Sequence, residues 1–375
     1  QVRVVAHVPQ LARRLTVTTD QRTDVALDRF WPVGGTQTYS LLQVGAFNPE
    51  SITFKGPGKL SGLFYFTYVY FFRWNYVYIL SMKHWITLTL TLALAPLHSQ
   101  TLVVLGTLQD GGSPHMNCEK SCCASPKPND YVACLGIYDS TLAVLFDATP
   151  DIVPQLGELL ERSGSKKYSV FLTHAHMGHY TGLAHFGREA ANTNKVPVYA
   201  MPRMIDFLAK NGPWSQLLKL QNITLNGLEE GVPRTLKNGL IAEPFLVPHR
   251  DEFSETVGYF IKKTGGKVAL YIPDIDKWEE WEENIIAVIP RVDYAFIDGT
   301  FFADGEVPRP MSEVPHPFIS ESAKLFSYIP REEREKIYFI HLNHSNPARN
   351  AEFEGRKALE AQGMHFADFG QEFQL

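Results

Sequence analysis

The chain has 375 residues, of which 45% are hydrophobic and 20% charged, so its composition predicts a packed globular core in one large domain or two. The formal net charge is -5 at pH 7. This charge argues against a nucleic-acid-binding surface spread over the whole protein and leaves only a local basic groove open. We therefore expect no nucleic-acid partner.

The first 81 residues differ in character from the rest. Residues 1–60 show no sustained hydrophobic period, and residues 64–80 are crowded with Phe and Tyr, which AT-rich codons encode. Tyr and Trp favour a membrane interface, but Arg73 and Asn75 in this segment disfavour a stable span. We expect residues 1–81 to be a non-native or unstructured extension, such as translated upstream sequence.

Residues 82–100 have the features of a secretory signal peptide. Met82 and Lys83 precede an apolar run that is too short for a transmembrane helix, and a small residue lies near its end. Alternating Thr and Leu over residues 87–92 would also suit an amphipathic strand. We favour the signal peptide, which predicts a mature chain from near Gln100. That chain would be periplasmic or extracellular, without a stable membrane anchor.

Residues 101–375 are predicted to form one α/β domain. Short apolar runs predict strands over 102–106, 141–147, 168–172, 196–200, 240–248, 255–261, 268–272, 294–298 and 336–340. Helices are predicted over 152–162, 181–191 and 204–210. This order fits a sandwich of two mixed β-sheets with helices outside.

Three histidines lie within six residues, in the loop after the predicted strand 168–172: His174, His176 and His179. His174 and His176 are two apart and can point the same way, while His179 can reach a second position. Neutral imidazole is the commonest side-chain ligand of zinc and iron, and the carboxyl ends of strands hold ligands in open α/β folds. The loop therefore predicts a metal site.

Further candidate ligands follow later predicted strands. His249 follows the strand 240–248, Asp274 follows the strand 268–272, and His341 follows the strand 336–340. Asp276 is a less favoured carboxylate because it lies two residues further from its strand.

The segment His174-Ala-His-Met-Gly-His179 resembles the H-x-H-x-D-H signature of the metallo-β-lactamase superfamily. The resemblance implies an αββα catalytic domain over 101–375 with an active-site metal centre. It places His174, His176 and His249 in a first site, and His179, Asp274 and His341 in a second, with Asp274 able to bridge.

Gly178 is the one departure from the signature, because the family has an Asp there that binds the second metal. The departure predicts a weaker second site, which Gly178→Asp is expected to strengthen. Other motifs, among them Leu105-Gly-Thr-x-x-Asp-Gly-Gly-x-Pro and Asp298-Gly-Thr-Phe, resemble the branch that contains the pyrroloquinoline-quinone biosynthesis protein B. That protein differs in the first His motif, so its exact activity does not transfer.

A cysteine cluster, Cys118, Cys122 and Cys123, predicts a metal site or a disulfide. The phosphonate-operon cyclic phosphodiesterase of the same superfamily pairs early cysteines with a His three residues after the last active-site ligand, the offset of His344 here. This resemblance implies a structural zinc on the three thiolates and His344. The alternative is a disulfide with Cys134 as a further thiol.

The resemblance implies a hydrolase in which a metal-activated water attacks an ester, lactone or phosphodiester-type bond of a small-molecule substrate. Zn2+ is the expected cofactor, with one or two ions in the active site. Asp274 and His249 are the main catalytic candidates, and Asp298 and Asp147 are further proton acceptors.

Two other functions stay open. Three His with a carboxylate also suit Fe2+ or Mn2+. With Fe2+ bound, the protein would be an iron-dependent oxidoreductase related to quinone biosynthesis. The other is a metal-binding protein without turnover. Substrate choice is expected to lie in the loop 301–321, with Asp304, Glu306, Arg309 and His316.

Overall fold

The computed structural model describes residues 100–375, except 125–126, 308–309 and 311–313, together with five short strands near the N-terminus. In a first unit, residues 1–88, two small antiparallel sheets form: β1 (Arg3–Val4) with β4 (Tyr39–Ser40), and β2 (Thr16–Thr18) with β3 (Asp24–Ala26) and β5 (Thr53–Phe54). Apart from these strands and Gln100, the expected extension and signal peptide lie outside the described residues.

The second unit contains two seven-stranded mixed sheets. The first has the order β11-β10-β9-β8-β7-β6-β19, parallel from β8 to β11 and antiparallel from β8 through β19. Its strands are β6 (Thr101–Gly106), β7 (Cys134–Tyr138), β8 (Ala143–Phe146), β9 (Tyr168–Phe171), β10 (Val196–Ala200), β11 (Ile223–Gly227) and β19 (Glu372–Gln374).

The second sheet has the order β12-β13-β14-β15-β16-β17-β18. It is antiparallel up to β15 and parallel from β15 to β18. Its strands are β12 (Arg234–Thr235), β13 (Leu240–Leu246), β14 (Val257–Lys263), β15 (Val268–Ile272), β16 (Tyr294–Asp298), β17 (Ile337–Ile340) and β18 (His365–Phe366).

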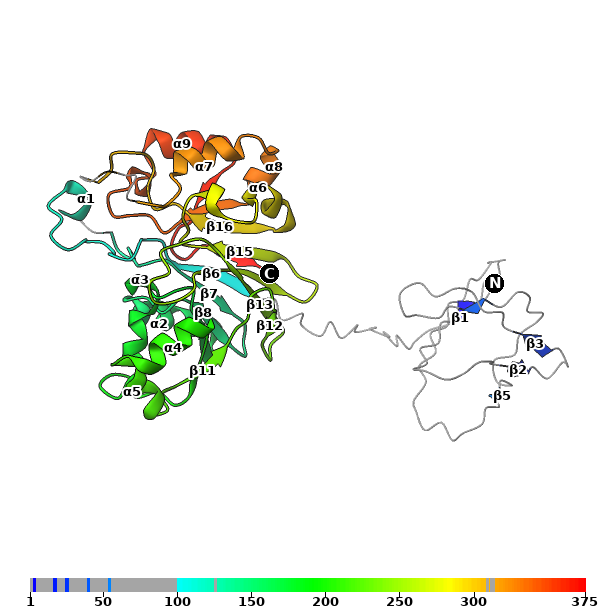
Figure 1. Ribbon diagram of the computed structural model, residues 1–375. Coiled ribbons are helices and arrows are strands. Elements are labelled where there is room, and N and C mark those ends of the chain that lie inside the picture. Colours follow the sequence, from blue (N-terminus) through cyan, green and yellow to red (C-terminus); the bar gives the residue numbers. More distant parts are fainter. Residues whose placement is uncertain are drawn as a thin grey trace, which may run out of the picture. The chain divides into compact units, whose positions relative to one another are not determined.

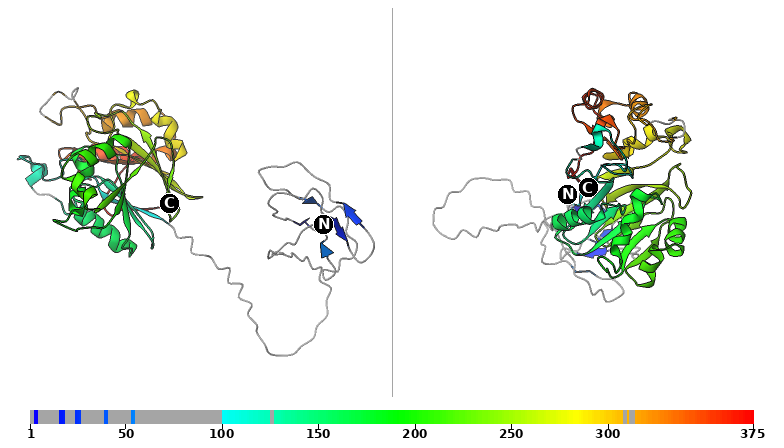
Figure 2. Two further views of the ribbon diagram at one scale, coloured as in Figure 1. Left: turned by 60° about the horizontal axis from the view of Figure 1, so that its bottom comes forward. Right: turned by 90° about the vertical axis from the view of Figure 1, so that its left-hand side faces the viewer.

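Helices cover the outer face of each sheet, which gives the predicted αββα sandwich (Figure 1). The first sheet is covered by α2 (Ile152–Ser163), α3 (Met177–Tyr180), η2 (Thr181–Phe186), α4 (Pro202–Lys210) and α5 (Trp214–Lys219). The second is covered by η3 (Trp278–Glu280), α6 (Ile285–Val288), η4 (Ile289–Arg291), α7 (Ile319–Phe326), α8 (Arg331–Arg334), η6 (Pro347–Arg349) and α9 (Glu354–Ala361). The four-residue α1 (Ser121–Ala124) lies in the loop after β6, as two further views show (Figure 2). No helix in the described part of the chain is long and apolar enough to cross a bilayer.

Successive side chains of a strand point to opposite faces of the sheet, so each sheet packs on both faces. In β8, Val144 and Phe146 belong to the core between the sheets, where Phe146 packs edge-on against Tyr259 at 5.3 Å between ring centroids. Leu145 points to the opposite face and packs with Leu159 of α2. Because both faces of the central strands are buried, they appear in the sequence as continuous apolar runs.

One predicted helix is wrong in kind and length. Residues 181–191 were expected to be an α-helix, but η2 is a 3-10 helix that ends at Phe186, after the short α3. Gly182 explains the local packing, because a Cβ there would lie 2.0 Å from the carbonyl oxygen of Thr149. The chain therefore passes close against the backbone after β8. This contact holds the preceding histidine loop beside that strand end.

Candidate metal centre

A first cluster of metal-binding side chains forms where β9, β13 and β15 end. Oδ2 of Asp274 lies 3.3 Å from Nε2 of His174, 3.2 Å from Nε2 of His249 and 3.8 Å from Nδ1 of His176. The four ligand atoms all lie within 4.8 Å of one another. This is the predicted first site with Asp274 added, and its geometry suits one metal ion.

A second cluster adjoins the first, since the rings of His174 and His179 are 4.2 Å apart. It consists of His179, His341 and Asp110, whose Oδ1 lies 3.0 Å from Nε2 of His179 and 3.6 Å from Nε2 of His341. Asp274, which the sequence placed in this second site as a ligand able to bridge both, groups with the first cluster. The carboxylate of the second cluster comes from the loop after β6, where Asp110 belongs to the motif that starts at Leu105 and was not among the predicted ligands.

Hydrogen bonds orient the imidazoles. Thr173 Oγ1 lies 3.0 and 3.1 Å from the Asp147 carboxylate oxygens and donates to this carboxylate, so it can accept from Nδ1 of His174 at 3.0 Å. Nδ1 of His179 donates to Oδ2 of Asp147 at 2.7 Å. Both rings therefore turn Nε2 toward the clusters. Metal-binding histidines are usually oriented in this way, by a hydrogen bond from the other ring nitrogen.

The histidines that follow β13 and β17 are oriented by similar hydrogen bonds. Nδ1 of His249 lies 2.8 Å from Oδ1 of Asp276, the carboxylate that the sequence rated second to Asp274. Thr300 donates to Asp298 at 2.7 Å and can therefore accept from Nδ1 of His341 at 2.9 Å. His341 has a positive φ of 65°, a backbone conformation that non-glycine residues rarely adopt and that is found at functional sites.

Five buried atoms in the clusters have no hydrogen-bond partner: Nε2 of His174, His179 and His341, and Oδ1 of Asp110 and Asp274. A buried polar atom without a partner is costly and calls for an explanation such as a bound ion. These atoms are imidazole nitrogens and carboxylate oxygens, which zinc and iron accept as ligands. The donor set therefore fits a metal centre.

The carboxylates of the clusters are held ionised. Burial by itself raises the pKa of Asp110 and of Asp274, but the neighbouring imidazoles lower both well below the usual range. Burial opposes protonation of His249, yet Asp274 raises the pKa of His249 to about 9. The carboxylate oxygens of both clusters are thus available as anionic ligands.

A third group consists of Asp274, Asp298 and His316, of which the sequence had placed His316 only in the specificity loop. Nδ1 of His316 lies 2.9 Å from Oδ2 of Asp298 and 3.1 Å from Oδ1 of Asp274. Burial opposes protonation of this ring, but the two carboxylates raise the pKa of His316 well above its usual value. Asp298 and Asp147, predicted as proton acceptors, are instead buried supports of His316 and His179. No motif in the sequence marks His316, since it lies in a loop far from the other histidines. Arg309 of that loop lies outside the described residues.

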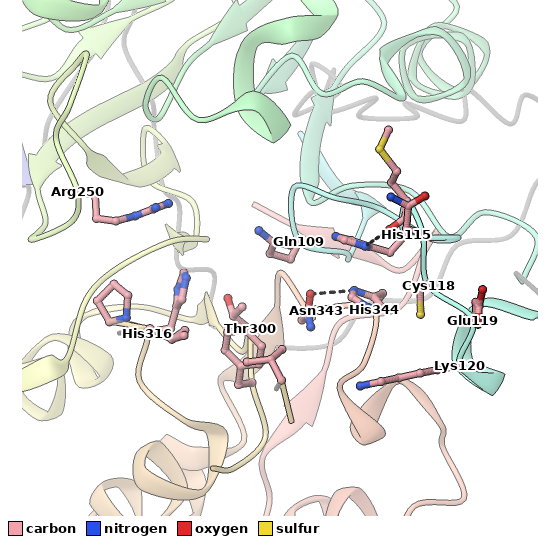
Figure 3. Close-up of a pocket in the computed structure, with 16 residues that line it drawn as sticks. Gln109, His115, Cys118, Glu119, Lys120, Arg250, Thr300, His316, Asn343 and His344 are labelled. Atoms are coloured by element: carbon pink, nitrogen blue, oxygen red, sulfur yellow. Dashed lines mark hydrogen bonds between the residues drawn. The ribbon is translucent and has the colours of Figure 1, made fainter. Parts of the chain in front are cut away.

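A cavity of about 600 Å³ lies against the centre (Figure 3). His316 lines it together with Thr300 and with Gln109 and Arg250, the neighbours of Asp110 and His249. The Arg250 guanidinium lies 3.5 Å from Nε2 of His176. A small molecule in this cavity would lie beside the clusters and would meet a positive charge at one end.

Two members of the cysteine cluster, Cys118 and His344, line another part of the cavity wall. Sγ of Cys122 lies 4.0 Å from Sγ of Cys118 and of Cys123, and with His344 the ligand atoms lie within 4.8 Å of one another. Four ligands around zinc at a Zn–S length of about 2.3 Å would put the sulfurs roughly 3.8 Å apart. Cys134 is buried on β7 beside the carbonyl of Asp147, and all four cysteines are free thiols. The arrangement fits a tetrahedral metal site rather than a disulfide.

Comparison with known proteins decides the family. The sequence profile described as Beta-lactamase superfamily domain matches residues 143–342. The chain belongs to the beta-lactamase superfamily. Within that superfamily it is similar to Coenzyme PQQ synthesis protein B of Cupriavidus taiwanensis, at 25% identity over 311 residues that cover 73% of this chain and 99% of that protein. The protein of the same name from Methylorubrum extorquens PA1 is 26% identical over 308 residues, 72% of this chain and 98% of that protein.

Solved structures show the same fold. The Zn2+-bound PqqB of Methylobacterium extorquens superimposes with a TM-score of 0.62 at 22% identity, over 73% of this chain and all of that one (100%). A diphosphatase from the PhnP family superimposes with a TM-score of 0.52 at 23% identity, over 74% of this chain and 97% of that one. The predicted family and αββα fold are confirmed, as is the likeness to the quinone-pathway protein.

Proposed function

We propose that this protein is a metal-dependent hydrolase that cleaves an ester, lactone or phosphodiester-type bond of a small molecule. The supporting observation is the juxtaposition of two donor clusters, five of whose buried nitrogens and oxygens have no hydrogen-bond partner, with a carboxylate-bound histidine at the wall of one cavity. Membership of the beta-lactamase superfamily agrees with this chemistry.

The first cluster would hold one metal ion through His174, His176, His249 and Asp274, and the second would hold another through His179 and His341. Zinc is the expected ion. A bound ion of this kind polarises the scissile group and lowers the pKa of a coordinated water to about 7. The protein's own part is to keep the donor atoms fixed: the carboxylates behind His179 and His249 hold both rings in place at 2.7 and 2.8 Å.

Proton transfer is assigned to His316 and Asp274. Because Asp298 and Asp274 occupy Nδ1 of His316, Nε2 is the nitrogen left to meet a substrate in the cavity. The raised pKa of His316 keeps this ring protonated near neutrality, so it can donate a proton to the leaving oxygen. Asp274 stays ionised and can accept a proton from the attacking water. Arg250 would attract a substrate with a negative group.

An iron-dependent oxidoreductase is the second candidate. The similarity to Coenzyme PQQ synthesis protein B favours it, and three imidazoles with one carboxylate suit Fe2+ as well as zinc. The two candidates differ in the metal retained and in their need for oxygen.

The test combines metal analysis with a substrate screen. The full chain is purified, its metals are measured by mass spectrometry, and the metal-loaded protein is offered p-nitrophenyl esters, lactones and bis(p-nitrophenyl) phosphate. We expect zinc and oxygen-independent hydrolysis of at least one class. Iron with substrate-dependent oxygen uptake would favour the oxidoreductase, and full metal occupancy without turnover of any class would contradict both.

The control for mechanism is His316→Gln. It should keep the metal content of the wild type and lose about 10²–10⁴-fold in rate on substrates with alkyl leaving groups, because these need protonation. Substrates that release p-nitrophenolate need it less and should be less affected.

A further inference from the structure

The second cluster contains a carboxylate that the superfamily signature does not supply. In this chain position 178 is Gly, so the loop that carries His174, His176 and His179 has no acidic residue. Oδ1 of Asp110 nevertheless lies 3.0 Å from Nε2 of His179 and 3.6 Å from Nε2 of His341. We propose that Asp110 is the anionic metal ligand of the second cluster, and that Gly178 provides the space that Asp110 occupies. This inference rests on the proposed metal-dependent function.

The space at Gly178 is filled by Asp110 itself. A Cβ built on Gly178 would lie 2.2 Å from Oδ1, 2.6 Å from Cα and 2.9 Å from Cγ of Asp110. Gly178 lies in α3 and is absent from the glycines with positive φ, so its backbone would accept any residue. The glycine is therefore required by the close approach of Asp110 and by nothing else in its own conformation.

This geometry overturns the expectation that Gly178→Asp would strengthen the second site. A side chain at 178 would meet the Cα of Asp110 as well as its carboxylate, so the loop after β6 would have to move. The substitution would push out one carboxylate in order to add another.

Backbone contacts hold Asp110 in place. The amide of Gln109 donates to the carbonyl of Leu342 at 2.9 Å, and the amide of Leu342 donates to the carbonyl of Thr107 at 2.7 Å. The segment before Asp110 is thus tied to the residue after His341. The turn continues with Gly112, whose amide donates to the Gln109 carbonyl at 2.8 Å and whose φ is +60°. Asp110 and His341 therefore keep a constant separation, as two ligands of one ion require.

The alternative is that Asp110 only forms ion pairs with the two imidazoles. Against this, Nδ1 of His179 and Nδ1 of His341 already have their partners in Asp147 and Thr300. The atoms that face one another, Nε2 of both rings and Oδ1 of Asp110, are all buried, and their short contacts lack the geometry of a hydrogen bond. Two imidazole nitrogens and a carboxylate oxygen that converge on one point without hydrogen-bond geometry are the pattern expected around an ion.

The test measures metal binding rather than activity. The protein is stripped of metal and titrated with Co2+, whose thiolate charge-transfer band reports the cysteine cluster separately from the nitrogen and oxygen ligands of the active centre. Wild type should bind two Co2+ at the centre. Asp110→Asn keeps the shape of the side chain and removes its charge, so the second Co2+ should bind at least ~100-fold more weakly while the first is retained.

Gly178→Ala is the second, independent variant. It leaves Asp110 intact but adds the colliding Cβ, so it should also weaken the second Co2+ and leave the first. Its matched control is Gly157→Ala, since a Cβ at Gly157 in α2 would meet nothing within 4 Å. The control for the loss of a carboxylate is Asp206→Asn, on the exposed side of α4. Retention of the first Co2+ in each variant reports that the fold is intact.

The proposal is overturned if Asp110→Asn or Gly178→Ala binds the second Co2+ as tightly as wild type, or if wild type binds one Co2+ at the centre. A protein that binds both ions through Asp110 but hydrolyses no substrate would contradict the proposed function and support this ligand assignment.

Discussion

Nδ1 of His316 lies 2.9 Å from Oδ2 of Asp298, and both side chains are buried. Asp298 is the last residue of β16, while His316 comes from a loop eighteen residues further on. The pair joins a rigid strand end to the wall of the cavity. It makes Asp298, together with Asp274, a carboxylate that favours the protonated form of the proposed acid.

Asp298→Asn is expected to move the alkaline limb of the pH–rate profile to lower pH. The charge of Asp298 favours the protonated ring and so raises the pKa of His316. Without that charge the pKa of His316 falls, and the protonated form is lost at a lower pH as the pH rises. The measurement is kcat/KM against pH on an alkyl ester or diester. Asp304→Asn, in the same loop but exposed, should leave the limb in place, and an unmoved limb in Asp298→Asn would exclude His316 as the acid.

The double substitution of His174 and His176 by Ala is expected to remove the metal of the first cluster. Half of its ligands are lost, and no other described side chain belongs to this cluster besides His249 and Asp274. Hydrolysis should fall by at least ~100-fold. Metal content by mass spectrometry and rate are compared with His185→Ala, an exposed histidine of η2. Unchanged metal stoichiometry in the double variant would show that the site lies elsewhere.

His344→Ala is expected to weaken zinc binding at the cysteine cluster by at least ~10-fold and to lower the melting temperature. Zinc there would tie the loop that contains Cys118 to the segment after His341. The matched control is His115→Ala, because the His115 ring stacks on His344 at 4.1 Å but does not belong to the cluster. Zinc and thiol assays on both variants check this. Wild-type zinc content in His344→Ala would refute the structural site.

We also propose export, which a chain starting at Met82 tests. Expressed in a bacterium with a general secretion pathway, it should be shortened near Ser99 or Gln100. Gln100 is fully buried, and its carbonyl accepts from the amide of Leu375 at 2.9 Å, so cleavage before it would leave the described domain whole. Mass spectrometry of the product shows whether the chain is cleaved. The control is Leu90→Arg in the apolar run, which should block cleavage. An uncut wild-type product would favour the amphipathic strand over residues 87–92.

Most of the strands and the histidine ligands were predictable from local sequence. Runs such as residues 141–147 and 268–272 are continuous and apolar because both faces of the strand are buried, and the signal is contained in a few consecutive residues. His174, His249 and His341 stand directly after such runs, so the same signal located them. β7 and β19 were not predicted. Gly136 interrupts the apolar run of β7, and β19 is a three-residue strand whose partner β6 lies far away in the chain.

The sequence by itself determined the αββα class, the family, the histidines of both clusters and the thiol cluster, since each depends on spacing within a motif or a strand. Only the tertiary structure decided which carboxylate meets which histidine. Asp110 comes to His179 across 69 residues, and His316 comes to Asp274 across 42, through loops whose paths depend on backbone hydrogen bonds to distant segments. A turn sequence predicts that the chain reverses there, but not what it approaches. The physical reason is that a strand is encoded by the pattern of neighbouring residues, whereas a ligand contact joins residues that are far apart in the sequence.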